Sequence, residues 1–195
     1  MKRSSYHHGN LKNTIIKTCH KLLQKKGATD FSLREVANLS GVSHAALYRH
    51  FQDKEEVLEI LSSIGFDKLG SLQKKVPQNK TNPDDYFVKL GLVYIQFAIK
   101  NPNYYRLMFQ TKRSDESPIL KRSKLKSYAI LVRGCRFYLK TKRKKENHRS
   151  FALMAWSLVH GYSNLCLETE FPDTESKTLN KSKLEMAEDI LRFAI

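Results

Sequence analysis

The chain has 195 residues, of which 41% are hydrophobic, and it carries 35 Lys and Arg against 19 Asp and Glu, a formal net charge of +16. This apolar share supports one or two packed domains and excludes global disorder. Three cysteines are too few for a disulfide scaffold, and no apolar run approaches the roughly 20 residues of a membrane span. We therefore expect a cytoplasmic protein whose charge favours nucleic acid as partner, with an anionic membrane surface as the weaker alternative.

The chain is expected to be helical almost throughout, because glycine and proline are scarce and no segment alternates with a period of two. The first predicted helix covers residues 10–26, and Gly27 supplies its left-handed stop. Two short helices follow within residues 32–51. A longer helix is expected from Asp53, which caps its start, to about residue 75.

The second half begins after a polar linker at 74–85 that two prolines interrupt. The pattern then predicts a central helix at 87–99 that is apolar nearly all round. A short helix at 102–110 and a long one from Pro118 to the basic run 142–145 come next. The last two predicted helices cover residues 149–168 and 184–195.

The last two predicted helices carry more apolar surface than one small subunit readily covers. The helix at 149–168 has two apolar stripes, and the helix at 184–195 has one. Such a pair of helices indicates a homodimer interface in which each subunit presents the same patch. The alternative is that the stripes fill the chain's own core, and periodicity alone does not decide between the two.

Residues 32–51 carry the strongest functional pattern. Ser32 and Glu35 predict a capping box at the start of one short helix, Gly41 permits a tight turn, and Ser43 caps a second helix. A helix, a glycine-containing turn and a helix form the geometry that places the second helix in the DNA major groove. The alternative is an ordinary helical corner with a solvated basic face.

The outward residues of this segment suit DNA recognition. Small and polar side chains at the start of the second helix permit close approach to base edges, while aromatic and basic ones offer hydrogen bonds to phosphate or guanine. A lysine at the start of the following helix is placed to hold a phosphate. The expected DNA-binding residues are Ser32, Arg34, Ser43, His44, Ala45, Ala46, Tyr48, Arg49, His50 and Lys54.

Residues 29–61 resemble the DNA-binding domain of the tetracycline-repressor (TetR) family of bacterial regulators. The opening Tyr6–Leu11 and the run Gly41–Phe51 resemble one branch of it, whose C-terminal domain has a Trp, His and Gly signature. Here that signature is Trp156, His160 and Gly161. The matching head residues are Val36-Ala37, Gly41-Val42-Ser43, Leu47-Tyr48, His50-Phe51 and Lys54-Glu55-Glu56-Val57-Leu58.

This chain departs from the family pattern at two positions of the DNA-binding segment. Ser40 stands where the family usually has Ala, and Ala45 stands where it often has Gly. Both residues are small, so these departures bear on the operator sequence and not on the fold.

The resemblance implies an all-α homodimer of about nine helices. Residues 1–54 would form the helix-turn-helix domain, the helix from 53 to about 75 would connect it, and residues 76–195 would form a regulatory and dimerisation domain. The resemblance also implies a palindromic double-stranded operator and a C-terminal domain in which small-molecule binding changes the spacing of the two DNA-binding heads. We expect a repressor that is released by a small apolar or amphipathic molecule. Carried over by position, Ser32, Tyr48 and Lys54 contact phosphate; the residues facing bases are Arg34, His44, Ala45, Ala46 and Arg49.

Aromatic residues concentrate in the middle of the chain, and most of them must belong to the core. Where they line an apolar pocket, tyrosine hydroxyls would serve as polar handles. For His160, a hydrogen-bonded packing position is favoured over a ligand contact, and the adjacent Gly161 indicates close helix approach. The expected pocket residues are Tyr94, Phe97, Tyr105, Tyr128, Trp156 and His160.

The sequence contains no motif typical of an enzyme active site, because no acidic pair, nucleophile triad or glycine-rich phosphate loop occurs. No catalytic residue, metal site or cofactor is therefore expected. His7 and His8 lack metal-site spacing and are assigned to an N-terminal arm, either touching DNA or disordered. The cysteines, expected to be buried, are Cys19, Cys135 and Cys166. Two alternatives to the regulator are a DNA-bound structural protein without an inducer and an enzyme or membrane-surface protein.

The positive charge is concentrated in two segments. Residues 1–54 hold ten basic and three acidic residues, and residues 112–149 hold fourteen and three. The larger block therefore lies outside the helix-turn-helix pattern. A solvated helix and loop is the first interpretation of it; an attraction for an acidic ligand and a second contact with DNA or another polyanion are the alternatives.

Overall fold

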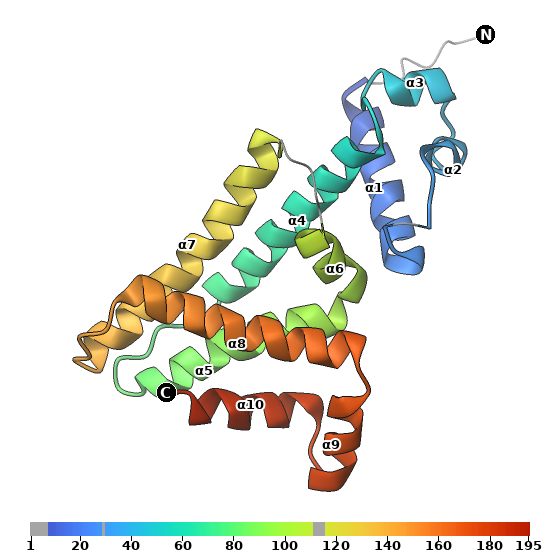
Figure 1. The fold of residues 1–195 in the computed structure, drawn as a ribbon. Helices are drawn as coiled ribbons and strands as arrows, with labels where there is room; N and C mark the ends of the chain where they lie inside the picture. Colours follow the sequence, from blue (N-terminus) through green and yellow to red (C-terminus); the bar gives the residue numbers. More distant parts are fainter. Residues whose placement is uncertain (1–7, 29, 111–115) are drawn as a thin grey trace. The chain divides into compact units, whose positions relative to one another are not determined.

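The computed structural model of the chain describes residues 8–28, 30–110 and 116–195, with side chains from residue 11 onward except that of residue 110. Within these residues all regular structure is α-helical, in ten helices, which confirms the all-α fold (Figure 1). His7 and the side chain of His8 lie outside the described residues. The chain divides into two compact units, which we call the head unit (residues 1–65 and 103–121) and the C-terminal unit (66–102 and 122–195).

The head unit is built from short helices around an apolar core. It contains α1 (His8–Lys26), α2 (Leu33–Leu39), α3 (His44–Tyr48), the first part of α4 (Lys54–Lys74) and α6 (Pro102–Gln110). Gly27 has a φ angle of +91°, the left-handed conformation expected of it, and Gly41 has a φ of +67° in the expected tight turn. The core residues that these helices bury include Ile15, Cys19, Leu23, Val36, Leu47 and Phe51.

The contacts of α6 assign it to the head unit, although the sequence groups it with the regulatory domain. The His20 Nδ1 atom lies 2.6 Å from the Tyr104 hydroxyl, and Asn103 donates a hydrogen bond of 3.1 Å to the Gln24 carbonyl. A Cβ atom on Gly65 would lie 2.7 Å from the Met108 sulfur. These contacts join α6 closely to both α1 and α4.

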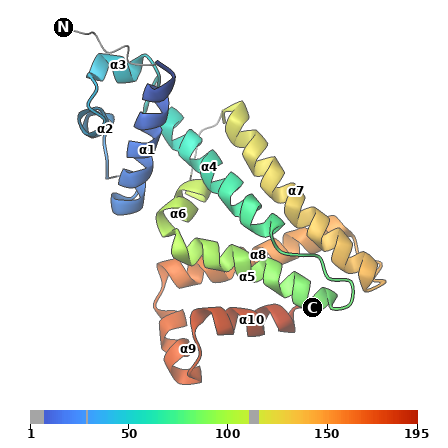
Figure 2. The ribbon, with the colours of Figure 1, turned by 180° about the vertical axis from the view of Figure 1, so that it is seen from behind.

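The C-terminal unit contains the last part of α4, α5 (Pro83–Lys100), nearly all of α7 (Pro118–Thr141), α8 (His148–Glu168), α9 (Phe171–Leu179) and α10 (Lys183–Phe193). α5 packs against α8 and α10, as seen from behind in Figure 2. Its burial on most faces confirms the expected central helix. The buried residues of α5 are Tyr86, Phe87, Val88, Leu90, Tyr94, Ile95, Phe97 and Ala98.

The cysteines are all buried, as expected, and none forms a disulfide. Burial raises the pKa of Cys19 and of Cys135 to about 12, so neither thiol forms a reactive thiolate near neutral pH. Among the described residues, no three His, Cys, Asp or Glu side chains cluster as metal ligands do. In the same part of the chain, no helix combines the length and apolarity needed to cross a membrane.

Candidate functional site

Side-chain caps define the two short helices of the helix-turn-helix. The Ser32 hydroxyl accepts a hydrogen bond of 3.2 Å from the Glu35 backbone N–H, and the Ser43 hydroxyl accepts one of 3.1 Å from that of Ala46. The expected capping box at Ser32 is only half formed, because the Glu35 carboxylate lies 2.7 Å from the Lys26 ammonium instead of returning to the cap. A charge-assisted bond to Lys26 competes successfully with the neutral backbone donor.

The start of α4 is held by a reciprocal pair of bonds. Asp53 accepts a hydrogen bond of 2.7 Å from the Glu56 N–H, and the Glu56 carboxylate accepts one of 2.7 Å from the Gln52 N–H. The cap at Asp53 is therefore confirmed. The Lys54 ammonium lies 4.9 Å from the centre of the Phe31 ring, a cation–π distance that orients this lysine.

All ten expected DNA-binding residues reach the surface of the head unit. Leu47 is fully buried and anchors α3, while Ser43, His44, Ala45, Tyr48 and Arg49 around it are exposed. The same holds for Ser32 and Arg34 at α2, and Ala46, His50 and Lys54 are partly exposed.

Two aromatic side chains on α3 support each other. The rings of His44 and Tyr48 meet edge to face, with centroids 5.0 Å apart. This contact limits the rotamers of both side chains on the exposed side of the helix. α3 thus offers small residues and hydrogen-bonding rings, and Arg49 follows directly at its end. This is the chemistry that base edges and phosphates require.

Four of the six expected pocket residues come together in the C-terminal unit. The Tyr94 hydroxyl oxygen lies 2.9 Å from His160 Nδ1 and accepts a hydrogen bond of 3.3 Å from the Trp156 indole. The Tyr128 ring lies beside that of Trp156, with centroids 6.1 Å apart. We call Tyr94, Tyr128, Trp156 and His160 the aromatic cluster.

The other two expected pocket residues lie elsewhere. Tyr105 belongs to the head unit, where its buried ring packs against Phe109 at a centroid distance of 5.1 Å. Phe97 is buried in the C-terminal unit and faces a groove that the aromatic cluster does not line. Helical periodicity could not separate these positions, because every aromatic residue on a buried helix face gives the same signal.

This groove was not predicted from the sequence. It has a volume of about 800 Å³ and lies between the end of α4, α5 and α10, all within the C-terminal unit. A signal for it was available in α5, where the polar residues Lys89, Gln96 and Lys100 interrupt a mostly apolar helix at spacings of seven and four and so share one side of it. The lining residues are Lys68, Leu72, Lys75, Val76, Pro77, Lys89, Leu92, Val93, Gln96, Phe97, Lys100, Asn101, Leu184, Glu185 and Glu188.

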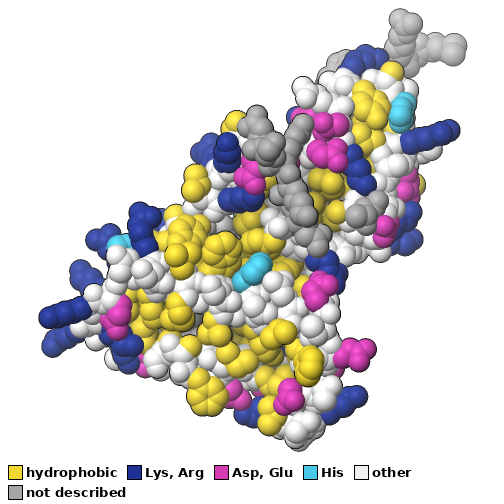
Figure 3. Space-filling view, in the orientation of Figure 1, with side chains coloured by type: hydrophobic (Ala, Val, Ile, Leu, Met, Phe, Trp, Pro, Cys, Tyr) yellow, Lys and Arg dark blue, Asp and Glu magenta, His cyan; other side chains and the backbone are white. Residues whose placement is uncertain are grey.

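The apolar stripes of the last helices fill mostly their own unit. Ala187 and Leu191 of α10 are buried, as are Ala155 and Val159 of α8. A different face of α8 stays exposed, and Figure 3 shows hydrophobic side chains gathered on the face that carries this helix. We call this the α8 face; its residues are Leu153, Met154, Ser157, Gly161 and Leu165.

Gly161 lies in open space. A Cβ atom built on it would meet no atom within 4 Å. The close helix approach expected at this glycine therefore does not occur among the described residues of the chain itself.

Comparison with known families covers both parts of the chain. Residues 15–61 match the family described as bacterial regulatory proteins, tetR family. Residues 87–187, more than half of the chain, match the family described as tetracyclin repressor-like, C-terminal domain. No curated protein matches the sequence.

Solved structures share the fold over nearly the whole chain. A protein described as of unknown function from Rhodococcus sp. RHA1 is 23% identical, with a TM-score of 0.77 and coverage of 99% of each chain. The TetR-family transcriptional regulator PfmR from Thermus thermophilus is 17% identical, with a TM-score of 0.66 and coverage of 92% of this chain and 96% of its own. The Bacillus subtilis regulator FadR, described as a complex with stearoyl-CoA, is 12% identical, with a TM-score of 0.64 and coverage of 94% and 97%. The chain belongs to the TetR family of bacterial transcriptional regulators.

Proposed function

We propose that this regulator is a homodimeric repressor that binds a palindromic operator through α2, α3 and the start of α4, and that a small molecule releases it. The observation that carries the DNA-binding part is the exposed surface of α3, where Leu47 alone points into the core. Phosphate contacts from Ser32, Tyr48 and Lys54 would fix the register, and Arg34, His44, Ala45, Ala46 and Arg49 would face bases. Ser43 and His50 complete the surface.

Footprinting on the DNA that flanks the protein's own gene tests this part. We expect a protected palindrome with half-sites about one helical turn apart. The double variant Arg34→Ala/His44→Ala should lose the footprint, because both side chains are proposed to face bases. Both are exposed, so the fold should be retained. The matched control is Arg133→Ala/Arg136→Ala, two exposed residues of α7. Equal binding to operator and scrambled DNA at physiological salt would contradict the proposal.

The proposed dimer is formed by α8 together with α10. Leu153, Met154 and Leu165 of the α8 face are 52%, 41% and 48% exposed, and Phe193 at the end of α10 is 89% exposed. Between the leucines lie Ser157 and Gly161, small residues that let a second helix approach closely. A second copy is the occupant that this surface fits, since a twofold interface pairs one patch with itself.

Light scattering after size exclusion tests the dimer. Met154→Glu/Leu165→Glu places four carboxylates in a twofold interface, and we expect a monomer at concentrations where the wild type is a dimer. Leu125→Glu/Ala129→Glu on the exposed side of α7 is the matched control and should stay dimeric. A wild-type monomer, or an unchanged mass of the first variant, would contradict the assignment.

The effector part rests on the C-terminal domain of this family and on the fold shared with FadR, which is described with stearoyl-CoA bound. The aromatic cluster offers an indole, two phenols and an imidazole as polar handles. Binding of an effector would favour a spacing of the two DNA-binding domains that misfits the operator. A thermal-shift screen should find a stabilising ligand. Its failure across a broad library would favour the alternative, a DNA-bound structural protein without an inducer.

A further inference from the structure

One face of α5 is left uncovered by the rest of the C-terminal unit. Its residues recur at a spacing of three or four and therefore share a side of the helix. They are the exposed Lys89, Gln96 and Lys100 and the partly exposed Leu92 and Val93. This face forms one wall of the groove of about 800 Å³, a volume within the usual range of ligand sites.

The interior of the groove is apolar. Leu72 of α4 and Val76 and Pro77 of the following loop lie on one side, and Leu184 of α10 lies on another. Each is at least partly exposed to solvent. Covering these surfaces with hydrocarbon would remove apolar area from water, so the groove favours an occupant with an alkyl chain.

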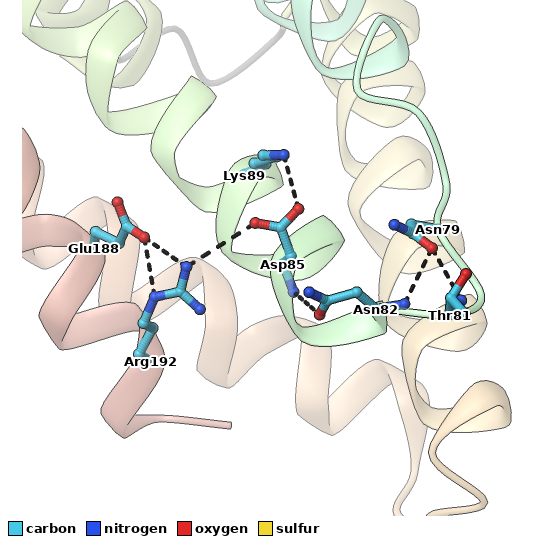
Figure 4. Close-up of polar contacts among 7 residues, drawn as sticks. All are labelled: Asn79, Thr81, Asn82, Asp85, Lys89, Glu188 and Arg192. Atoms are coloured by element: carbon cyan, nitrogen blue, oxygen red, sulfur yellow. Dashed lines mark hydrogen bonds and ion pairs between the residues drawn. The ribbon is translucent and has the colours of Figure 1, made fainter.

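The carboxylates at the rim are already engaged. Glu185 completes the capping box of α10 by accepting a hydrogen bond of 2.7 Å from the Ser182 N–H. Glu188 pairs with Arg192, and the Arg192 guanidinium also lies 4.0 Å from Asp85 (Figure 4). These bonds hold the acidic groups of this edge among partners from α10 and α5.

The lysines at the rim are less fully paired. Lys89 lies 2.7 Å from Asp85, and Lys68 donates a hydrogen bond of 3.0 Å to the Asn101 side chain. Within the described ranges, the ammonium groups of Lys75 and Lys100 make no hydrogen bond or ion pair. The groove therefore presents an apolar interior with unmatched positive charge at its rim.

We propose that this groove binds a long-chain amphiphile with an anionic head group. Lys75 and Lys100 neutralise the head group, and the alkyl chain covers Leu92, Val93 and Leu184. Lys89 and Lys100 are eleven residues apart, about 16 Å along the helix axis, which leaves room for an extended chain between them.

A role for this groove as the effector site rests on the proposed function, whereas binding itself does not. Lys100, which is proposed to hold the head group, lies shortly before Asn103, where the chain passes from the C-terminal unit to the head unit. An anion held by Lys100 would act next to this connection. It would then bias the equilibrium between states of the regulator that bind operator differently.

The test measures binding to the full chain by isothermal titration calorimetry, below the critical micelle concentration of each anionic probe and below the solubility limit of the alcohol. Hexadecyl phosphate, palmitate and hexadecanol share one tail and differ in head group. We expect both anions to bind and hexadecanol to bind at least about tenfold more weakly, because only the anions meet the lysines. The ratio of the two anions distinguishes a phosphate-bearing ligand from a carboxylate.

Two variants locate the site. Lys75→Glu/Lys100→Glu should weaken both anions about tenfold or more, since two attractive charges become repulsive. Gln96→Trp should block the groove without disturbing the core, because Gln96 is exposed. The matched control Arg133→Glu/Arg136→Glu changes the net charge equally on exposed α7 residues and should bind as the wild type does.

The proposal is overturned if no anion binds, if hexadecanol binds equally well, or if the groove variants keep wild-type affinity. If palmitate binding is weakened by Tyr94→Phe and is unchanged in Gln96→Trp, the ligand binds at the aromatic cluster. This result would also overturn the proposal. Operator binding by the same variants without ligand is measured in parallel. If the wild type does not bind the operator, the proposed function fails. The calorimetric result still tests ligand binding in the groove, because that measurement does not depend on DNA.

Discussion

Tyr94, Trp156 and His160 form a chain of two hydrogen bonds through the Tyr94 hydroxyl. An indole N–H can only donate, so the Tyr94 oxygen accepts the bond from Trp156 and its own phenol proton is available to His160 Nδ1. The phenol donates to Nδ1 in the His160 tautomer that carries its proton on Nε2. Burial lowers the pKa of His160, which favours the same neutral state. The hydrogen-bonded packing position favoured by the sequence matches this geometry, and a ligand contact for His160 stays a prediction.

This arrangement predicts a pH dependence of stability. In the unfolded chain His160 titrates near its ordinary pKa of about 6.5, whereas burial keeps the folded pKa lower. As the pH falls from above the unfolded pKa towards the lower folded pKa, the unfolded state binds more protons than the folded state. The free energy of unfolding therefore decreases. His160→Gln should reduce this loss between about pH 7.5 and pH 5.5, measured by urea unfolding. The control is His44→Gln, in the exposed part of α3; an equal slope in wild type and His160→Gln would contradict the prediction.

Substitutions of Arg34 and Lys54 should weaken DNA binding in different ways. If Arg34 contacts a base, Arg34→Ala should cost about 1–3 kcal/mol of operator affinity and reduce discrimination between sequences. If Lys54 contacts phosphate, Lys54→Ala should weaken operator and unrelated DNA alike and reduce the salt slope by about one. Fluorescence anisotropy titrations at several salt concentrations measure both. Identical behaviour of the two variants would exclude this division of roles.

At the scale of helices, most elements are predictable because caps and periodicity agree. The expected helix at 149–168 is α8 (His148–Glu168), and that from Asp53 to about 75 is α4 (Lys54–Lys74). α9 (Phe171–Leu179) was missed because its nine residues hold no apolar stripe and no side chain caps its start. Its local signals are Pro172 in its first turn and Asn180 at its end, where φ is +51°.

The functional surfaces were predictable to different degrees. The DNA-binding residues follow from local pattern, since exposure on α3 depends on a short capped helix. The aromatic cluster and the groove depend on which helices pack together, and periodicity carries no information about that choice. Gly161 illustrates this limit of prediction. The sequence shows that a glycine lies within a helix, but it does not show whether a neighbouring helix approaches that glycine.

The contact of α10 with α5 depends on the absence of a side chain at Gly91. A Cβ atom there would lie 2.9 Å from both terminal carbons of Leu191 and 3.4 Å from a methyl group of Val159. Gly91→Val should therefore lower the free energy of unfolding by about 1–3 kcal/mol and speed hydrogen exchange in α10. Ala129→Val on the exposed side of α7 is the control and should cost a few tenths of a kcal/mol, about the propensity difference. Unfolding of Gly91→Val at the wild-type urea concentration would contradict this packing.

At the scale of the whole molecule, the net charge of +16 divides into parts with different surroundings. Lys142 lies 2.9 Å from Asp84 and, by donating to it, lowers the pKa of that carboxyl. The Lys144 ammonium lies 5.7 Å from the centre of the Tyr138 ring. Lys142 and Lys144 therefore contact groups of their own unit, which supports the interpretation of the basic run as part of a solvated helix and loop.

Neutralising the exposed part of this run should leave DNA binding unchanged. In Arg143→Gln/Lys144→Gln/Lys145→Gln, the Asp84 pair with Lys142 is retained, so the fold is spared. We expect the slope of log affinity against log salt to equal that of the wild type, because these charges release no counterions from DNA. A slope shallower by one or more would establish a second DNA contact at the α7–α8 turn.

The assignment of α6 makes the head unit discontinuous in sequence. Tyr104, Leu107 and Met108 are buried in it, yet they are encoded almost forty residues after Gly65. A fragment ending at residue 65 would therefore lack part of its own interior, with Cys19 and its neighbours short of packing partners. Chimeras that exchange operator specificity between family members should therefore carry residues 103–121 together with residues 1–65. A single cut in the sequence after residue 65 would divide the head unit.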